Sequence, residues 1–71
     1  MTVPRLREIR LSAVLTQVAL AAKAGVAEPT VVAAERGKKI RISTVQKLAA
    51  ALGVSPQDLV RTEHTTEGDR G

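Results

Sequence analysis

The stretch that decides the fold runs from Thr16 to Lys39 and reads TQVALAAKAGVAEPTVVAAERGKK. Thr16 is a preferred helix-capping residue type, and the apolar spacing behind it predicts a helix over residues 17–24. Gly25 ends that helix because glycine accepts a positive φ. Pro29 suits the first turn of a second helix over residues 28–36. The stretch therefore predicts two short helices joined by a tight turn and followed by a basic loop.

The flanking sequence predicts three further helices, so the expected fold is all-α and compact, with five helices. Pro4 fits the first turn of a helix over residues 3–13. Ser43 and Gln46 have the spacing of a capping box, and we expect Ser43 to cap a helix that Gly53 closes. The last helix is expected to start at Pro56 and to end near residue 61.

Apolar residues at helical spacing give the expected core. Leu6, Ile9, Leu11 and Ala13 form the inward stripe of the first helix, and Arg10 falls outside it. Small and apolar side chains of the central stretch are expected to pack where its two helices cross, and three residues after it are expected to anchor the core. These are Leu15, Leu20, Ala21, Val26 and Val31, followed by Ile40, Ile42 and Val45.

Charge divides the 71-residue chain into two parts. Residues 1–61 carry ten Lys or Arg and four Asp or Glu, a net charge of +6, and they form the expected domain. Residues 62–71 carry a net −2 and few apolar groups, so we expect a mobile, acidic-leaning tail. A basic domain suits an acidic partner such as nucleic acid, although solvated lysines are the ordinary explanation of such a charge.

The composition excludes several classes of function. The chain has no Phe, Tyr or Trp, which argues against modules that stack single-stranded bases on aromatic side chains. It has no cysteine for a disulfide or a thiolate metal site, and no apolar run is long enough to span a bilayer. His64 is isolated in the tail, and Thr16, Ser43 and Ser55 are better explained as helix caps than as nucleophiles. We therefore expect no enzyme, metal or cofactor, no membrane contact, and a cytoplasmic location.

Several motifs together resemble the lambda-repressor/Cro-like, or XRE-type, helix-turn-helix family over about residues 6–60. The residues that carry the resemblance are Leu6-Arg7-Glu8-Ile9-Arg10, Thr16-Gln17, Leu20-Ala21, Lys23-Ala24-Gly25-Val26, Thr30-Val31, Glu35-Arg36-Gly37-Lys38, Leu48-Ala49, Ala51-Leu52-Gly53-Val54-Ser55 and Asp58-Leu59-Val60. The resemblance implies a five-helix DNA-binding domain whose second and third helices form the helix-turn-helix.

The resemblance also implies roles for particular residues. Gln17 would meet a DNA phosphate at the start of the second helix, although it can equally be a solvated helix-start residue. A basic loop of Lys38, Lys39 and Arg41 would follow the sugar-phosphate backbone, unless it is simply solvated. Arg10 and Glu35 match a pair that orients the third helix. Arg36 is compatible with either a phosphate contact or plain exposure.

The third helix departs from the family pattern where base edges are usually read. The positions are Ala27, Glu28, Pro29, Thr30, Val32 and Ala33, without an arginine or amide among them. Glu28 can accept from cytosine N4, or it can repel phosphate and serve the helix dipole instead. Thr30 can bond phosphate or touch a thymine methyl, whereas Val32 and Ala33 offer only apolar contact. Val14 also stands where the family has glycine, so the end of the first helix is expected to differ or to run on.

Two functions remain open at this point. The first is a sequence-specific regulator of transcription, a repressor that binds a palindromic operator in duplex DNA as a homodimer. The homodimer would form through the fifth helix and the C-terminal region, with Leu59 and Val60 on its surface. The alternative is a protein-interaction module, such as an antitoxin or adaptor, that binds a protein partner through Val32 and Ala33 and reads few bases.

Overall fold

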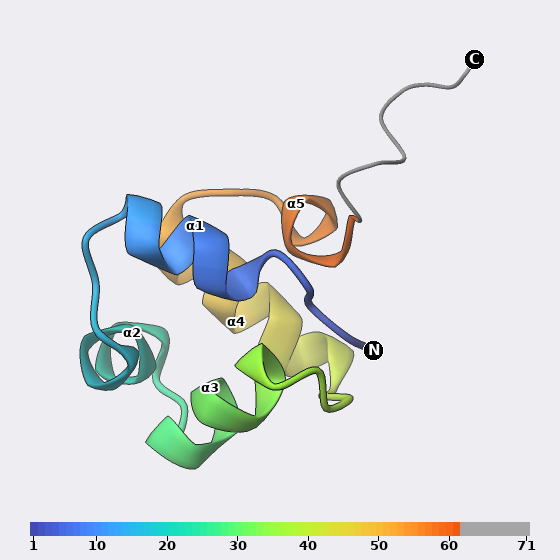
Figure 1. Cartoon of the computed structure of the whole chain (residues 1–71), viewed down its shortest axis with the longest axis horizontal. Helices are drawn as coiled ribbons and strands as arrows, with labels where there is room; N and C mark the ends of the chain where they lie inside the picture. Colours follow the sequence, from blue (N-terminus) through green and yellow to red (C-terminus); the bar gives the residue numbers. More distant parts are fainter. Residues whose placement is uncertain (62–71) are drawn as a thin grey trace.

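The computed structural model describes residues 1–61, and this region holds five helices and no strand (Figure 1). The helices are α1 (Leu6–Ser12), α2 (Gln17–Ala24), α3 (Glu28–Glu35), α4 (Ile42–Leu52) and α5 (Pro56–Val60). The predicted all-α fold is confirmed. The predicted tail over residues 62–71, including His64, lies outside the described residues.

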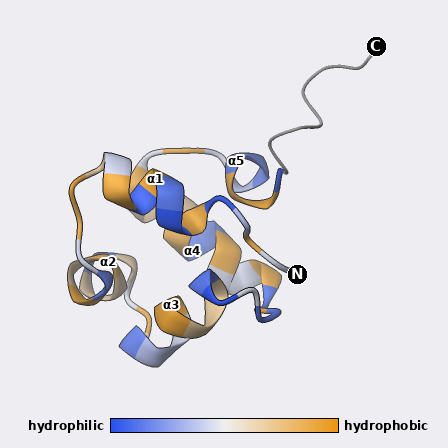
Figure 2. Ribbon diagram, in the orientation of Figure 1, coloured by the Kyte–Doolittle hydropathy of each residue, from blue (hydrophilic) through white to orange (hydrophobic). Residues whose placement is uncertain are grey.

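Helix α4 lies at the centre of the bundle and packs against α2 and α5, while α1 contacts α3 and α5 (Figure 1). Helices α2 and α3 pack against each other across the turn that joins them. Every helix contributes to one core, whose buried apolar residues are Val3, Leu6, Leu20, Ala21, Val31, Ala34, Val45, Leu48, Ala49 and Leu59. Three of these are alanines, which lets short helices approach closely. Figure 2 shows that the segment after α3 is hydrophilic.

The segment before α1 is tied to the body at two places. Met1 and Ile40 exchange two hydrogen bonds through their main-chain atoms, with N···O distances of 2.8 and 2.9 Å. The Arg5 N–H donates to the Leu59 carbonyl at 3.2 Å, and Val3 between these ties is 1% exposed. The segment therefore holds both the loop after α3 and the last helix, an arrangement that no local sequence pattern predicts.

The predicted helix ends are correct for α2 and need correction for α1 and α4. Helix α1 begins at Leu6, since Pro4 lies in a turn before it, and ends at Ser12. Helix α4 begins at Ile42 with Arg41 as its N-cap residue, so the predicted Ser43 cap is wrong. Ser43 lies inside the first turn, where its side chain cannot accept from the N–H groups that a cap satisfies.

Five side-chain predictions are also wrong. Leu11 is 52% exposed and Ala13 is exposed, because α1 is too short for a stripe that includes all four of its predicted residues. Ile42, the first residue of α4, is 61% exposed and does not anchor the core. Arg10, which the periodicity placed outside, is only 7% exposed. Leu59, predicted on a dimer surface, is fully buried in its own core and leaves only Val60, half-buried, from that pair.

The end of α1 shows how valine replaces glycine in a helix stop. The Leu15 N–H donates to the Arg10 carbonyl at 3.3 Å and the Val14 N–H donates to the Leu11 carbonyl at 3.0 Å, which is a Schellman motif. The same bond pattern ends α2, α3 and α4, where glycine takes the positive φ. Val14 has φ of 58° and is 89% exposed, so a β-branched residue holds the left-handed conformation without any packing gain.

We predict that Val14→Gly stabilises the protein. A non-glycine residue in the left-handed region costs roughly 1–2 kcal/mol, which glycine would relieve. Glycine also makes the unfolded chain more flexible, and this offsets about 0.5–1 kcal/mol of the relief. The expected net increase in the free energy of unfolding is about 0.5–1 kcal/mol, measured by urea denaturation. Val14→Ala is the matched control and should change little, because its Cβ keeps most of the strain. A Val14→Gly variant less stable than the parent would show that Val14 is not strained in its left-handed conformation.

Candidate nucleic-acid interface

A buried ion pair joins α1 to α3. Arg10 Nε donates to Glu35 Oε2 at 2.5 Å and Arg10 Nη2 donates to Glu35 Oε1 at 3.1 Å, so the pair is bidentate. The side chains of Arg10 and Glu35 are only 8% and 4% exposed. Arg10 Nη1 also donates to the Leu15 carbonyl at 2.6 Å, which fixes the chain between α1 and α2. The pair expected from the resemblance is therefore formed, and it orients α3.

The charged state of this pair is favoured in the folded protein. Burial alone would raise the pKa of the Glu35 carboxyl, but hydrogen bonds from Arg10 and Gln17, together with the charges of Arg10 and Arg7, lower that pKa below its usual value. The hydrogen bond to Glu35 raises the pKa of Arg10 despite its burial. Both groups are therefore ionised at neutral pH, and α3 is held by charge-assisted hydrogen bonds.

Gln17 belongs to the same network. Its Nε2 donates to Glu35 Oε1 at 3.0 Å, which fixes the side-chain amide at the start of α2. Thr16 caps this helix as predicted, since its hydroxyl accepts from the Ala19 N–H at 3.0 Å. Gln17 is half-buried, and its amide keeps one N–H that Glu35 does not use. The sequence did not predict the bond between Gln17 and Glu35, because these residues lie on different helices.

The outward face of α3 contains a depression of about 360 Å³. It is lined by Glu28, Pro29, Val32, Ala33, Arg36 and Lys38. Six of the ten predicted DNA-binding residues thus come together in one place. The apolar members lie along the middle of the face, with a carboxylate at the start of α3 and two cations at its end. This arrangement suits a ligand that has an apolar group and negative charge at one side.

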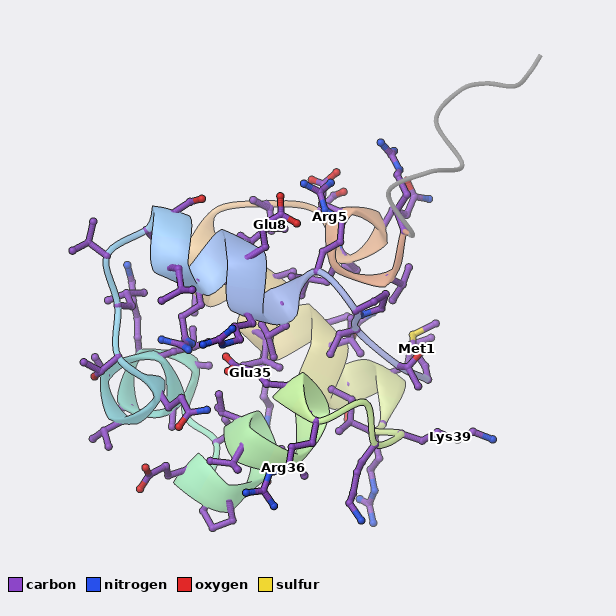
Figure 3. All side chains as sticks on the ribbon, viewed as in Figure 1. Met1, Arg5, Glu8, Glu35, Arg36 and Lys39 are labelled. Carbon is purple, nitrogen blue, oxygen red and sulfur yellow. The ribbon has the colours of Figure 1, made fainter. Side chains whose placement is uncertain are left out.

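The basic loop after α3 extends the positive end of this face. Lys38, Lys39 and Arg41 are exposed, as is Arg36, and Figure 3 shows Lys39 extending away from the body while Glu35 lies inside the bundle. The Lys38 N–H donates to the Ala33 carbonyl at 3.1 Å, and the Ile40 pairing with Met1 fixes the far end of the loop. The backbone of the loop is therefore held while its cationic side chains remain available to an anion.

Some predicted site residues are not part of the depression. Gln17, Thr30, Lys39 and Arg41 do not line it, although all lie on α2, on α3 or in the loop. Thr30 is half-buried, and its N–H donates to the Ala27 carbonyl at 3.0 Å. Ala27 is the N-cap residue of α3 and forms no side-chain cap.

Other kinds of site find no support in the part of the chain that the structure describes. Within residues 1–61, no three His, Asp or Glu side chains gather where they could hold a metal ion. None of the five described helices is long and apolar enough to cross a membrane.

This arrangement of helices matches a known protein family. The helix-turn-helix family model matches residues 6–59, which cover all five helices almost completely. No curated protein matches the sequence significantly.

Solved structures agree with the family match. The restriction-modification controller protein C.AhdI from Aeromonas hydrophila is 38% identical, with 78% of this chain and 85% of that chain covered and a TM-score of 0.74. The N-terminal DNA-binding domain of the master biofilm regulator SinR from Bacillus subtilis is 32% identical, covering 94% of this chain and 100% of that one, with a TM-score of 0.76. SinR in complex with SinI is 30% identical, covering 96% and 68%, with a TM-score of 0.80.

We predict that breaking the Arg10–Glu35 pair is strongly destabilising. Arg10→Met leaves the Glu35 carboxylate buried without its cation, and such a loss costs about 3–5 kcal/mol. Urea denaturation at neutral pH measures the change. Glu8→Gln is the control, since it breaks the exposed Arg5–Glu8 pair at 3.2 Å and should leave the midpoint nearly unchanged. An Arg10→Met variant as stable as the parent would show that the pair does not hold α3.

The same pair predicts a dependence of stability on pH. Because the pKa of Glu35 is lower in the folded protein than in the unfolded chain, the group contributes stability above the ordinary glutamate pKa of about 4.3. This contribution is lost as the pH falls through the lowered pKa. The urea midpoint should therefore drop below about pH 4.3, and the drop should be smaller in Glu35→Gln, which cannot titrate. Identical pH profiles for the two proteins would contradict this assignment.

Proposed function

Because the chain belongs to the lambda-repressor/Cro-like (XRE-type) helix-turn-helix family of DNA-binding transcription regulators, which are not enzymes, we propose that it represses transcription as a homodimer on a palindromic operator. One observation carries the proposal: the exposed face of α3 ends in a cluster of cations formed by Arg36 and the loop residues Lys38, Lys39 and Arg41. A helix of this kind lies in the major groove while the residues around it contact phosphates.

The contacts divide into two kinds. Four cations and the Gln17 amide are available to phosphate oxygens, and these contacts position the domain without reading sequence. The side chains of α3 that would face the base edges and read them directly are Glu28, Pro29, Thr30, Val32 and Ala33, since Val31 is buried in the core. Because only Glu28 and Thr30 carry polar side chains there, direct base discrimination is modest, and the sequence-dependent shape of DNA supplies the rest.

Two copies are needed for useful affinity and specificity. One module makes few contacts, whereas a two-fold dimer places two copies of α3 in successive major grooves about 34 Å apart. Leu59 cannot contribute to the dimer surface because it is buried, so the exposed Pro56 and Gln57 and the half-buried Val60 remain on α5. Residues 1–61 would form the DNA-binding domain, and a protein that acts on DNA in this way would work in the cytoplasm.

A second candidate is favoured by the apolar lining of the depression. Val32 and Ala33 can bind a protein side chain instead of a base, and the SinR relative is described in complex with a protein. A partner captured equally well after nuclease treatment, and lost on Val32→Glu but not on changes to the basic loop, would support this candidate.

We predict that replacing Lys38, Lys39 and Arg41 together with alanine abolishes specific and non-specific duplex binding alike. With three to four phosphate contacts per subunit, the parent dimer should show a slope of log affinity against log salt of roughly −5 to −7. The triple variant should lose most of that slope in fluorescence-anisotropy titrations.

The matched control removes the same charge elsewhere, through Lys23→Ala, Lys47→Ala and Arg61→Ala on α2, on α4 and after α5. It should keep most of the affinity. The proposed mode of binding would be refuted if the affinity of the parent protein did not change between low and moderate salt. It would also be refuted if the control variant lost as much affinity as the triple variant.

A further inference from the structure

We infer that α3 reads the C5-methyl group of a pyrimidine and that 5-methylcytosine fits its depression best. The inference rests on the proposed DNA-binding function and names the base chemistry that this face takes. It comes from three features of the depression: an apolar floor, one carboxylate beside it, and cations at the opposite end.

The floor of the depression is apolar and continuous. Pro29, Val32 and Ala33 line it, and their spacing of three and four residues makes them neighbours on one face of α3. These side chains offer no hydrogen bond, so they cannot distinguish bases by donors and acceptors. The apolar group that a base edge presents in the major groove is the methyl on C5 of a pyrimidine. Burial of one methyl is worth about fourfold in affinity.

Glu28 supplies the second feature. It lies four residues before Val32, so its carboxylate is next to the apolar floor. Within residues 1–61, the Glu28 side chain makes no hydrogen bond or ion pair, and an ionised carboxylate can only accept. It is therefore available to a donor from outside the protein.

The combination of acceptor and apolar floor selects among the bases. Cytosine presents an amino donor on C4, next to C5, whereas thymine presents an oxygen acceptor there that a carboxylate repels. Thymine has the methyl but lacks the donor, and cytosine has the donor but lacks the methyl. Adenine offers a donor without a methyl. Only 5-methylcytosine satisfies Glu28 and Val32 together.

The cations at the opposite end orient α3 in the groove. Arg36 lies four residues after Val32, and Lys38 follows it at the rim of the depression. Eight residues of helix span about 12 Å, which is close to the width of the major groove, about 12 Å. Arg36 and Lys38 can therefore contact the phosphates at one wall while Glu28 and Val32 face the bases. The reverse orientation would place Glu28 against phosphate.

The test uses random duplex pools made with cytosine or with 5-methylcytosine in its place. A sequence selected by the full-length protein is then synthesised with cytosine, 5-methylcytosine or thymine at each pyrimidine of the half-site, and binding is measured by anisotropy. At one symmetric position, 5-methylcytosine should bind about tenfold or more tightly than cytosine, since two half-sites contribute about fourfold each. Thymine there should bind more weakly than 5-methylcytosine.

Two variants and a control locate the effect. Glu28→Gln can donate as well as accept, so its preference for 5-methylcytosine over thymine should fall to within about threefold. Val32→Ala should reduce the effect of the methyl itself. Lys39→Ala should weaken binding to all three duplexes equally, because phosphate contacts do not read bases.

The results distinguish a failure of the methyl-reading site from a failure of the proposed DNA-binding function. Salt-dependent duplex binding that is indifferent to C5 methylation at every position would overturn the methyl-reading site and leave the DNA-binding function intact. A methyl preference that Glu28→Gln and Val32→Ala both leave unchanged would also overturn it. Failure to bind any of the duplex pools would overturn the proposed function itself.

Discussion

The buried ion pair between Arg10 and Glu35 is the constraint on which the interface depends. Five short helices around a small core leave little apolar area to fix the angle of α3. The bidentate pair adds a directional contact, and Gln17 and the Leu15 carbonyl extend it to α2 and to the preceding turn. A buried pair of this kind adds little net stability compared with apolar packing, but its bidentate hydrogen bonds form only when the two helices lie at a matching distance and angle. Its value here is the placement of α3.

With α3 placed in this way, the cations proposed to contact phosphates and the side chains proposed to read bases lie on different parts of the exposed surface. The cations gather at the end of α3 and in the loop behind it, where Gly37 turns the chain at φ of 90°. The middle of α3 carries no arginine or amide side chain and presents an apolar floor beside Glu28. In the proposed mode of binding, the phosphate contacts therefore do not depend on the residues that would distinguish one base from another, and either set can change without the other.

The sequence predicted the local features well because each depends on a few adjacent residues. The Thr16 cap, the glycine stops and the prolines in the first turns of α3 and α5 were all read from short patterns, and the structure confirms them. A capping pattern alone did not locate the start of α4. Ser43 has capping chemistry, yet α4 begins at Ile42, with Arg41 as an N-cap residue that makes no side-chain cap.

The sequence by itself determined the helices, the family and the cationic loop, since capping, periodicity and charge are properties of neighbouring residues. It also identified the residues of the outward face of α3. Only the tertiary structure decided that Arg10 is buried, that Gln17 bonds Glu35 and that Met1 holds the loop at Ile40. These contacts join residues at least 18 positions apart, so they exist only after the core has packed and brought α1, α2 and α3 together.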